Sequence, residues 1–461
     1  MANKENIPKN FLHLSVKICE NTNGIFDKSK IIKEEEFDIN EKAYLFLKDD
    51  NQIVIDKNQS SRQEDEILLF RVKPENEEYI QLENNLPKNS LKLTKDLIHS
   101  LNYKLWYVIK NYPEENEKDI NNIIEDNINE DYYLSENDII RLGNFKFILK
   151  EIHLKNYNKD FFLNNKNNLK YDIHDINKNN NPVFEFTPKL ENYKLTEEKD
   201  IICSICNKSN CNIDNPIVSL CDCEFYQNKH YKCLKERFKS ELMIVPNNKE
   251  ASINYFLKYR CINCKNQIPL SFKIGEENKE LIDFSLPQKK EYLFFESLEY
   301  ITKFEEYEKS FHLVELNSDN DNDITTISIG RDGSIEKNRD NDIKIFEPSV
   351  SRGKHAVIEY NKKQGTLLLK NKSKTSDTLI AIKEGLKINK NKIHLQIGRI
   401  FIEACLLKEN KIENIKKIKT RKEYDEEIER EKNKKIEEEQ MFQNTEQLTN
   451  ENFFDHSDEE N

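Results

Sequence analysis

Residues 201–264 read IICSICNKSNCNIDNPIVSLCDCEFYQNKHYKCLKERFKSELMIVPNNKEASINYFLKYRCINC. Seven cysteines and one histidine in this stretch form four close pairs, namely Cys203-x2-Cys206, Cys221-x-Cys223, His230-x2-Cys233 and Cys261-x2-Cys264. One or two intervening residues let both side chains of a pair converge on one ion, and a tetrahedral zinc site takes four such ligands. The four pairs therefore predict two structural zinc ions.

The competing interpretation of these cysteines is a disulfide framework. The chain is long, its start has no apolar segment typical of a secretory signal, and the histidine stands at ligand spacing. We therefore favour metal ligands in a reducing compartment. Cys211 fits no pair, and Cys19 and Cys405 are expected to be ordinary thiols.

The order of the ligands resembles that of a RING-CH finger, the RING variant whose fourth and fifth ligands are cysteine and histidine. The resemblance implies interleaved sites in a cross-brace, listed here by ion: Cys203, Cys206, His230 and Cys233; Cys221, Cys223, Cys261 and Cys264. A PHD finger has the same ligand order, and Tyr259 suits its preferred aromatic position. The single-residue spacer between Cys221 and Cys223 and the six residues before His230 favour RING-CH.

Composition restricts the function classes. The chain has 461 residues, and 84 acidic against 72 basic side chains give a net charge of −12. This balance argues against general nucleic-acid binding, which needs a basic face. No apolar run reaches the roughly 18 residues of a membrane span. We expect a cytoplasmic or nuclear protein that binds neither nucleic acid nor membrane.

The pattern along the chain predicts a multidomain, mainly β protein with a small zinc-bound α+β module. We expect a β-rich domain at 10–155, a polar linker at 156–198, the finger at 199–272, a connector at 273–310, a second β domain at 311–409, and a charged helix with an acidic tail at 410–461. After Cys233, the residues Leu234, Phe238 and Leu242 recur at helical spacing and predict one apolar helix face. The long segment before Cys261 is expected to form a loop between Val245 and Ser252.

The second β domain contains four motifs in order. These are Ile329-Gly330-Arg331, Asn341-Asp342-Ile343-Lys344-Ile345, Val350-Ser351-Arg352-Gly353-Lys354-His355-Ala356, and Leu367-Leu368-Leu369-Lys370-Asn371-Lys372-Ser373. They resemble a forkhead-associated (FHA) domain, a β-sandwich whose loops bind phosphothreonine. The resemblance implies that Gly330 and His355 are structural. It implies that Arg331 and Ser351 contact the phosphopeptide, with Arg352 and Ser373 as weaker contacts.

Two features depart from the family pattern. Three residues separate Ser351 from His355, where the family has two. Near the third loop, Ser376-Asp377-Thr378 stands where the family places a peptide-contacting asparagine, and Asp377 would repel a phosphate. We therefore expect weak binding, on the order of −5 to −6 kcal/mol.

The two β-rich domains share a pattern. Residues 136–145 parallel residues 390–401, and both look like the closing strands of an FHA sandwich. The N-terminal domain lacks a clear serine and histidine pair, so we expect at most a divergent, non-binding copy there.

From about residue 130 to 409, the order of elements resembles protist proteins that join a RING-CH finger to an FHA domain. The resemblance implies a ubiquitin ligase or ligase adaptor with two partners, a ubiquitin-conjugating enzyme and a phosphothreonine protein. A RING performs no covalent chemistry and instead orients the charged enzyme. Ile205, Leu234 and Ile262 match positions that line its docking groove. The alternatives are a non-enzymatic phospho-dependent scaffold and a PHD-like histone-tail reader.

Overall fold

The structure is a computed structural model of the chain. It describes residues 10–22, 25–39, 42–47, 53–56, 67–75, 79–83, 105–110, 132–157, 189–190, 201–209, 212, 214–221, 223, 226–246, 252–258, 260–265, 268, 270–274, 277–284, 286–287, 289–299, 309–316, 323–331, 341–374, 376–382, 385–388, 393–408 and 430. Most of the predicted linker and, apart from Arg430, the predicted C-terminal helix and tail lie outside these residues. Among the described residues, no helix is long and apolar enough to cross a membrane.

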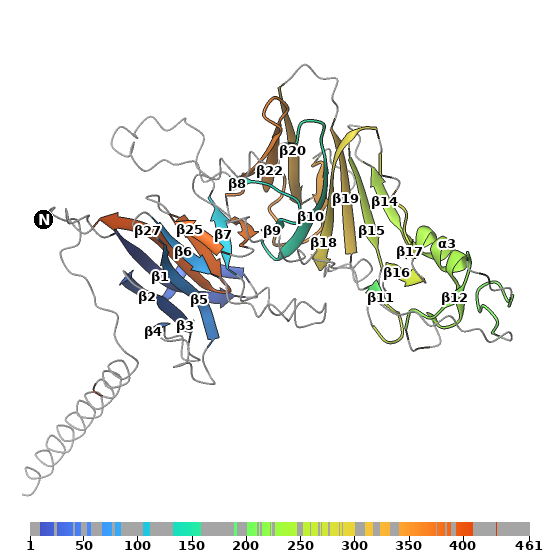
Figure 1. Ribbon diagram of the computed structural model, residues 1–461, viewed down its shortest axis with the longest axis horizontal. Helices are drawn as coiled ribbons and strands as arrows, with labels where there is room; N and C mark the ends of the chain where they lie inside the picture. Colours follow the sequence, from blue (N-terminus) through green and yellow to red (C-terminus); the bar gives the residue numbers. More distant parts are fainter. Residues whose placement is uncertain are drawn as a thin grey trace, which may run out of the picture.

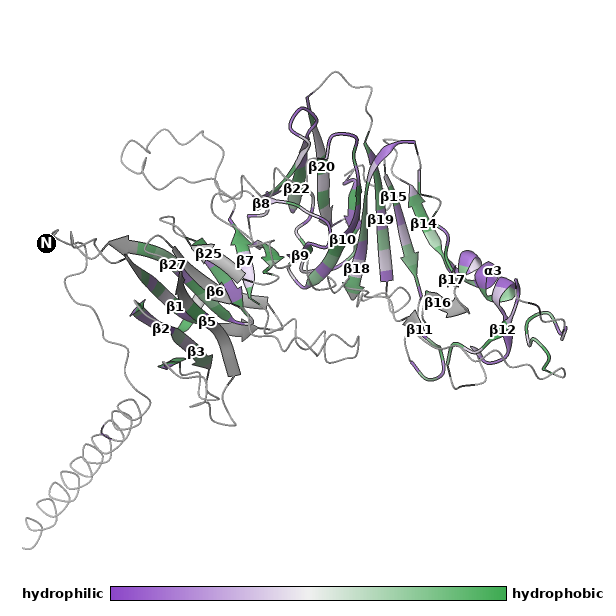
Figure 2. Cartoon of the chain, viewed as in Figure 1, coloured by the Kyte–Doolittle hydropathy of each residue, from purple (hydrophilic) through white to green (hydrophobic). Residues whose placement is uncertain are grey.

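The described chain is mainly β, as predicted. Alternation of side chains forms the strands. In β10 (Phe145–His153), Phe145, Phe147 and Leu149 point into the main core while Lys150 faces the other side and pairs with Glu296. Figure 2 shows the resulting mixture of hydrophilic and hydrophobic residues along the strands.

A twelve-stranded sheet runs through both halves of the described fold. Its strands in spatial order are β14 (Met243–Pro246), β15 (Ser252–Leu257), β19 (Lys309–Leu316), β18 (Glu291–Glu299), β10, β9 (Ile139–Leu142), β24 (Thr378–Ala381), β7 (Trp106–Ile109), β26 (Ile393–Ile397), β27 (Ile400–Lys408), β1 (Asn10–Thr22) and β2 (Ile25–Ile39).

Two five-stranded sheets pack against this long sheet. The first is β21 (Ile343–Ile345), β20 (Ile324–Arg331), β22 (Ala356–Asn361), β23 (Thr366–Asn371) and β8 (Tyr132–Tyr133). The second is β25 (Gly385–Ile388), β6 (Tyr79–Glu83), β5 (Ile67–Glu75), β3 (Ala43–Leu47) and β4 (Ile53–Asp56). Each forms a β-sandwich with one half of the long sheet. We call them the C-terminal and the N-terminal sandwich, respectively.

The two sandwiches have the same strand order. Reading outward from the neighbours β24 and β7, the long sheet continues as β9, β10, β18 and β19 on one side and as β26, β27, β1 and β2 on the other. The five-stranded sheets correspond in the same way, since β21-β20-β22-β23-β8 matches β4-β3-β5-β6-β25. The described strands β1–β10 and β18–β27 therefore form two sets of ten that correspond one by one in their order along the chain.

The halves exchange their last three strands. Strands β8, β9 and β10 follow the N-terminal strands in sequence but pair within the C-terminal sandwich, where β10 joins β18 and β8 joins β23. Conversely, β25 pairs with β6 and β27 with β1. Figure 1 shows this by colour, because orange strands lie among blue ones in the N-terminal sandwich. The predicted boundaries at 155 and 311 therefore do not coincide with the sandwiches.

The cysteine-rich module is inserted between β10 and β18. Its described elements are β12 (Ile217–Val218), β13 (Lys229–His230), the helix α3 (Tyr231–Glu241) and the hairpin β14–β15, followed by β16 (Ser271–Ile274) and β17 (Glu277–Glu280), with β11 (Lys189–Leu190) beside β16. Helix α3 has the predicted apolar face, with Tyr231, Leu234 and Phe238 buried. Strands β14 and β15 flank the predicted loop, whose tip lies outside the described residues.

The module packs on the outer face of the C-terminal sandwich. In β18, Leu293 and Phe295 face the sandwich core, whereas Tyr292 and Phe294 join a second core with Leu234 and Phe238 of the helix. Strand β15 also pairs with β19 along its whole length. A shared core and a shared sheet fix the module on the sandwich (Figure 1).

Candidate functional site

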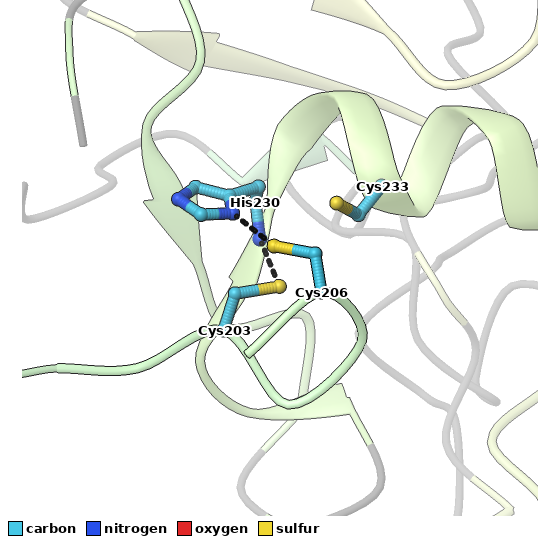
Figure 3. Close-up of side chains that lie close together, drawn as sticks. All are labelled: Cys203, Cys206, His230 and Cys233. Carbon is cyan, nitrogen blue, oxygen red and sulfur yellow. Dashed lines mark hydrogen bonds between the residues drawn. The ribbon is translucent and has the colours of Figure 1, made fainter. Parts of the chain in front are cut away.

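The first group of metal-ligand side chains comes from three places in the chain. Cys203 and Cys206 lie on one turn, His230 ends β13, and Cys233 lies in the first turn of α3. Their ligand atoms all lie within 4.8 Å of one another. Figure 3 shows the three sulfur atoms and the imidazole directed toward a common centre. The His230 Nδ1 atom lies 3.2 Å from the Cys206 sulfur, so Nδ1 is the nitrogen placed to bind an ion.

The second group contains only cysteines. Cys221, Cys223, Cys261 and Cys264 also bring their sulfur atoms within 4.8 Å of one another. The Cys223 sulfur lies 3.0 Å from that of Cys221 and 3.1 Å from that of Cys261. The two groups alternate along the sequence, so the structure brings together the two sets that the RING-CH resemblance implies.

The local backbone explains how a Cys-x2-Cys pair can converge. Each pair lies on a tight turn that ends in a residue with positive φ, Asn207 at 55° and Lys265 at 59°. Their amide groups donate to the carbonyl oxygens of Cys203, at 2.8 Å, and of Cys261, at 2.9 Å. The same turn occurs at both sites, and it holds the two sulfur atoms of each pair on one side.

The electrostatics of the first group favour a cation. Burial raises the pKa of Cys203, but backbone N–H groups donating to its sulfur outweigh this and lower it to about 6. Burial and the neighbouring sulfur atoms raise the pKa of Cys233 to about 12. Crowded sulfur atoms oppose one another's ionisation until a cation neutralises them. Sulfur and imidazole donors in fours suit Zn²⁺ better than the oxygen-preferring Ca²⁺ or Mg²⁺.

The three predicted docking residues of the finger differ in exposure. Ile205 is 40% exposed and Ile262 is 61% exposed, each inside a Cys-x2-Cys turn. Leu234 is fully buried in the core that α3 shares with the sandwich, so the expectation that it lines a surface groove is wrong. The helical spacing that predicted its apolar face could not tell which apolar residues stay at the surface.

The second candidate site lies where β20 ends beside the segment between β21 and β22. The Arg331 amide donates to the Ser351 carbonyl at 3.0 Å, and His355 N–H donates to the Ile329 carbonyl at 2.7 Å. These bonds place the predicted residues Gly330, Arg331, Ser351 and His355 together. The Nε atom of Arg331 is buried and, within the described part of the chain, has no hydrogen-bond partner. Such a group favours an anionic acceptor from a ligand.

His355 holds the loops together from inside. It is fully buried, and burial lowers its pKa to about 4, so the ring is neutral near pH 7. Its Nδ1 accepts the Ser351 amide proton at 3.0 Å, which leaves Nε2 to donate to the Asp377 carbonyl at 3.5 Å. The structural role that the resemblance implied for His355 therefore has a defined geometry.

Ser351 and Ser373 meet at this site through a hydrogen bond between their hydroxyl groups. Asn371 orients the second loop, since its Oδ1 accepts from the Ser373 amide at 3.0 Å and from the Thr378 hydroxyl at 3.2 Å. A hydroxyl pair can donate to a phosphate oxygen. Arg352 forms an isolated backbone β-bridge with Arg331, and its side chain is exposed.

Gly353 accommodates the extra residue between Ser351 and His355. Gly353 has φ of 77°, a conformation that favours glycine, and its carbonyl would lie 1.6 Å from a Cβ at position 330. Asn341 donates its Nδ2 to the same carbonyl at 3.2 Å. The altered spacing thus leaves Ser351 bonded to His355, and Gly330 is structural because no side chain fits there.

The Ser349 hydroxyl, two residues before Ser351, contacts the β9–β10 hairpin. It accepts the Asn144 amide at 2.7 Å, and the Gly143 turn packs against it. The β9–β10 hairpin from the N-terminal half therefore supports the loop that carries Ser351. Sequence reasoning missed Asn341, Asn371 and Gly143 as supporting residues; the partner of Gly143, Ser349, lies in the other half of the chain.

The comparisons with known proteins agree with this geometry. Residues 327–402 match the family model of the FHA domain, which binds phosphothreonine-containing peptides. No curated protein and no solved structure gives a significant match to the chain. The match begins in β20 and ends in β27, so it includes strands of both sandwiches.

Proposed function

We propose that this protein is a phosphothreonine-dependent adaptor whose two-zinc finger recruits a ubiquitin-conjugating enzyme, and that it acts as a ubiquitin ligase or ligase adaptor in the cytoplasm or nucleus. The observation that carries the first half is the convergence of Arg331, Ser351 and Ser373 on loops braced by buried His355. The second half of the proposal, recruitment by the finger, is supported by the packing of the cysteine-rich module on the C-terminal sandwich, because the two then act as one unit.

In the proposed peptide complex, the Arg331 guanidinium and the Ser351 and Ser373 hydroxyls bind the phosphate. Charge-assisted hydrogen bonds of this kind are the strong ones, and arginine presents several donors in a fixed fork. Exposed Arg352 and Lys354 add positive charge at the rim of a chain whose net charge is −12. The N-terminal sandwich, with the same strand order, is proposed to be a second FHA-like unit that serves as support.

In the finger, the zinc ions have a structural role. Each would be held by one group of four ligands, and binding supplies the folding free energy that a small module lacks. The ligands themselves leave no position open for a reacting water, which is typical of structural sites. Exposed Ile205 and Ile262 support docking of a conjugating enzyme, since one apolar residue projects from each zinc turn.

A peptide-binding experiment tests the phosphate half. The full chain should bind members of a phosphothreonine peptide library more tightly than the unphosphorylated library. The full chain is needed because an excised block from 305 to 410 would lack β8, β9 and β10 of its own sandwich. Equal binding of both libraries would refute phosphate recognition.

An autoubiquitination assay with a panel of conjugating enzymes tests the ligase half. Ile205→Ala should abolish transfer without loss of zinc, while Ile324→Ala, which changes an exposed isoleucine at the start of β20, should not. Inactivity of the unaltered chain with every enzyme would favour the scaffold. Selective binding of histone-tail peptides instead would favour the PHD-like reader.

Native mass spectrometry of protein purified without chelator tests the metal content. We expect two zinc ions per chain, each contributing on the order of 10–16 kcal/mol to the stability of the finger. Cys206→Ser should lose zinc, whereas Cys405→Ser, a change in β27 far from both groups, should retain two ions. One ion or none in the unaltered protein would contradict the two-site proposal.

A further inference from the structure

The hairpin β14–β15 belongs to the cysteine-rich module by sequence and to the C-terminal sandwich by pairing. It lies between Cys233, a ligand of the first group, and Cys261, a ligand of the second. Strand β15 pairs with β19 from Ser252 to Leu257 and thereby extends the long sheet. The two ligand groups therefore hold both ends of a segment that forms one edge of the sandwich.

Asn254 in β15 is fully buried and makes polar contacts through both atoms of its amide. Its Oδ1 accepts the Lys344 amide proton at 3.1 Å and contacts His312 Nδ1 at 2.7 Å. Its Nδ2 lies 3.4 Å from the Asp342 carbonyl oxygen and 3.5 Å from that of Val245. The neutral His312 ring donates from Nδ1 because Oδ1 can only accept.

Two of the backbone groups that Asn254 contacts, the Lys344 amide and the Asp342 carbonyl, belong to β21 and to the residue before it. Strand β21 has only three residues, and it pairs with β20 so that Lys344 lies opposite Gly330 and Ile345 opposite Arg331. The outer edge of so short a strand would otherwise expose its amide and carbonyl groups. The Asn254 side chain takes the place of a neighbouring strand there.

Asp342 and the preceding residue link β21 to the loops that carry Arg331, Ser351 and Ser373. We call these the phosphate loops. The Asp342 carboxylate accepts from the amide of Ser328 at 2.7 Å and from its hydroxyl at 2.8 Å. Asn341 donates to the Gly353 carbonyl, between Ser351 and His355. From Asn254 to Arg331 there is therefore only one intervening strand, and each step is a hydrogen bond.

We propose that Asn254 is a positioning residue of the phosphopeptide site. The β14–β15 hairpin, here called the finger hairpin, is thereby part of that site. The inference rests on the proposed phosphothreonine binding. It goes beyond that proposal by making peptide affinity depend on a segment outside the matched residues 327–402. Loss of metal from the finger should weaken peptide binding even though no metal ligand lies on the phosphate loops.

The test compares variants of the full, zinc-loaded chain with one phosphothreonine peptide selected by the unaltered protein. Asn254→Ala should bind it about tenfold more weakly, since two loop-fixing hydrogen bonds are lost. Asn254→Asp keeps the acceptor for Lys344 and His312 but sets a buried carboxylate oxygen against the Asp342 and Val245 carbonyl oxygens, so it should not recover the affinity lost in Asn254→Ala. Ile244→Thr, at an exposed position on β14, is the matched control and should bind normally.

Amide hydrogen exchange separates positioning from a general loss of stability. In Asn254→Ala, exchange should accelerate at Lys344 and in residues 351–355, with zinc content and the exchange of β22 and β23 unchanged. Normal affinity in a variant whose Lys344 amide exchanges faster would overturn the inference and leave phosphate recognition intact. If the unaltered chain shows no phosphate preference, the proposed function itself fails. Should Asn254→Ala not fold, the chelator titration of the unaltered chain carries the test.

A chelator titration adds an independent measurement. Removing zinc from the unaltered chain should reduce peptide affinity in parallel with the metal released, and restoring zinc should recover it. Unchanged affinity of a metal-free chain that keeps both sandwiches folded would also overturn the inference.

Discussion

The hairpins β9–β10 and β26–β27 occupy equivalent places in the two sandwiches, yet each comes from the opposite half of the chain. Both have a glycine of positive φ at the turn, Gly143 at 59° and Gly398 at 52°. Hairpin β9–β10 lies between β18 and β24, and β26–β27 lies between β1 and β7. The same local form thus serves two structural units, and its position in the sequence does not reveal which one.

The difference between the sandwiches concerns the loops. The C-terminal sandwich places Arg331, Ser351 and His355 at one end, with the finger hairpin along its edge. In the N-terminal sandwich, β3, which corresponds to β20, ends in Phe46-Leu47 and carries no glycine and arginine pair. One framework is therefore shared, and among the described residues the glycine and arginine pair ends the strand of the C-terminal sandwich and not its N-terminal counterpart.

A matched pair of core substitutions tests the exchange of strands between the two sandwiches. Phe147→Ala in β10 should destabilise the C-terminal sandwich by about 3–5 kcal/mol, because its ring is fully buried and contacts Phe295. Ile402→Ala in β27 should cost the N-terminal sandwich about 2–5 kcal/mol. Phosphopeptide binding followed in increasing urea should fail earlier in Phe147→Ala and at the normal concentration in Ile402→Ala.

The expected result opposes what the sequence match would suggest, because Ile402 lies inside residues 327–402 and Phe147 lies far outside. If instead Ile402→Ala lowers the midpoint of peptide binding and Phe147→Ala leaves it unchanged, each sandwich is built from its own half of the chain.

Acid should weaken the C-terminal sandwich through its buried histidines. Burial lowers the pKa of His355 to about 4 and that of His312 to about 3, both below the ordinary 6.5. Unfolded chains bind these protons and the folded state does not, so the contribution is complete above pH 6.5 and is lost as pH falls from there toward 4. The gap for His355 alone corresponds to roughly 3 kcal/mol.

Urea unfolding at a series of pH values, followed by peptide binding, measures this loss. His355→Asn should start less stable at pH 7 and decline less steeply between pH 6.5 and 4. A slope unchanged by that substitution would mean that folding does not lower the pKa of His355.

Much of the site could be predicted from sequence because it depends on local spacing. Cysteine pairs one or two residues apart converge whatever surrounds them, and the motifs at Gly330-Arg331 and Ser351 to His355 keep their order in a sandwich. The apolar helix after Cys233 followed from its period alone. The two groups of ligands implied by the RING-CH resemblance lie together, although the identity of the ion stays a prediction.

The rest depends on pairing between distant segments. Strands β9 and β26 both place alternate apolar residues in the main core, and β24 and β7 are neighbours, so a chain leaving either can enter either sandwich. Periodicity identifies a strand and its faces but carries no information about its partner. For the same reason the role of Asn254 and the burial of Leu234 could not be predicted, since both depend on which surface the module covers.

Arg331 separates the two sandwiches chemically. Arg331→Ala should remove most of the preference for the phosphorylated peptide, about tenfold or more, because a charge-assisted hydrogen bond is worth roughly 1.5–3 kcal/mol. Lys363→Ala is the control, since this exposed lysine follows β22 at the opposite end from the phosphate loops. Calorimetry with paired phosphorylated and unphosphorylated peptides gives the ratio directly, and an equal loss for both peptides would assign Arg331 to backbone binding instead.

The smallest expected effect concerns Asp377, the residue that stands where the family places an asparagine. His355 donates to the backbone carbonyl of Asp377, so replacing the side chain should leave that bond in place. Asp377→Asn removes a negative charge beside the proposed phosphate and should tighten phosphopeptide binding about two- to threefold, as for a partly solvated charge pair. The gain should shrink as salt is raised, because exposed charges are screened over about 10 Å at 0.1 M. Affinity measured at low and high salt tests this, and an equal gain at both, or one shared by the unphosphorylated peptide, would show that Asp377 does not act on the phosphate.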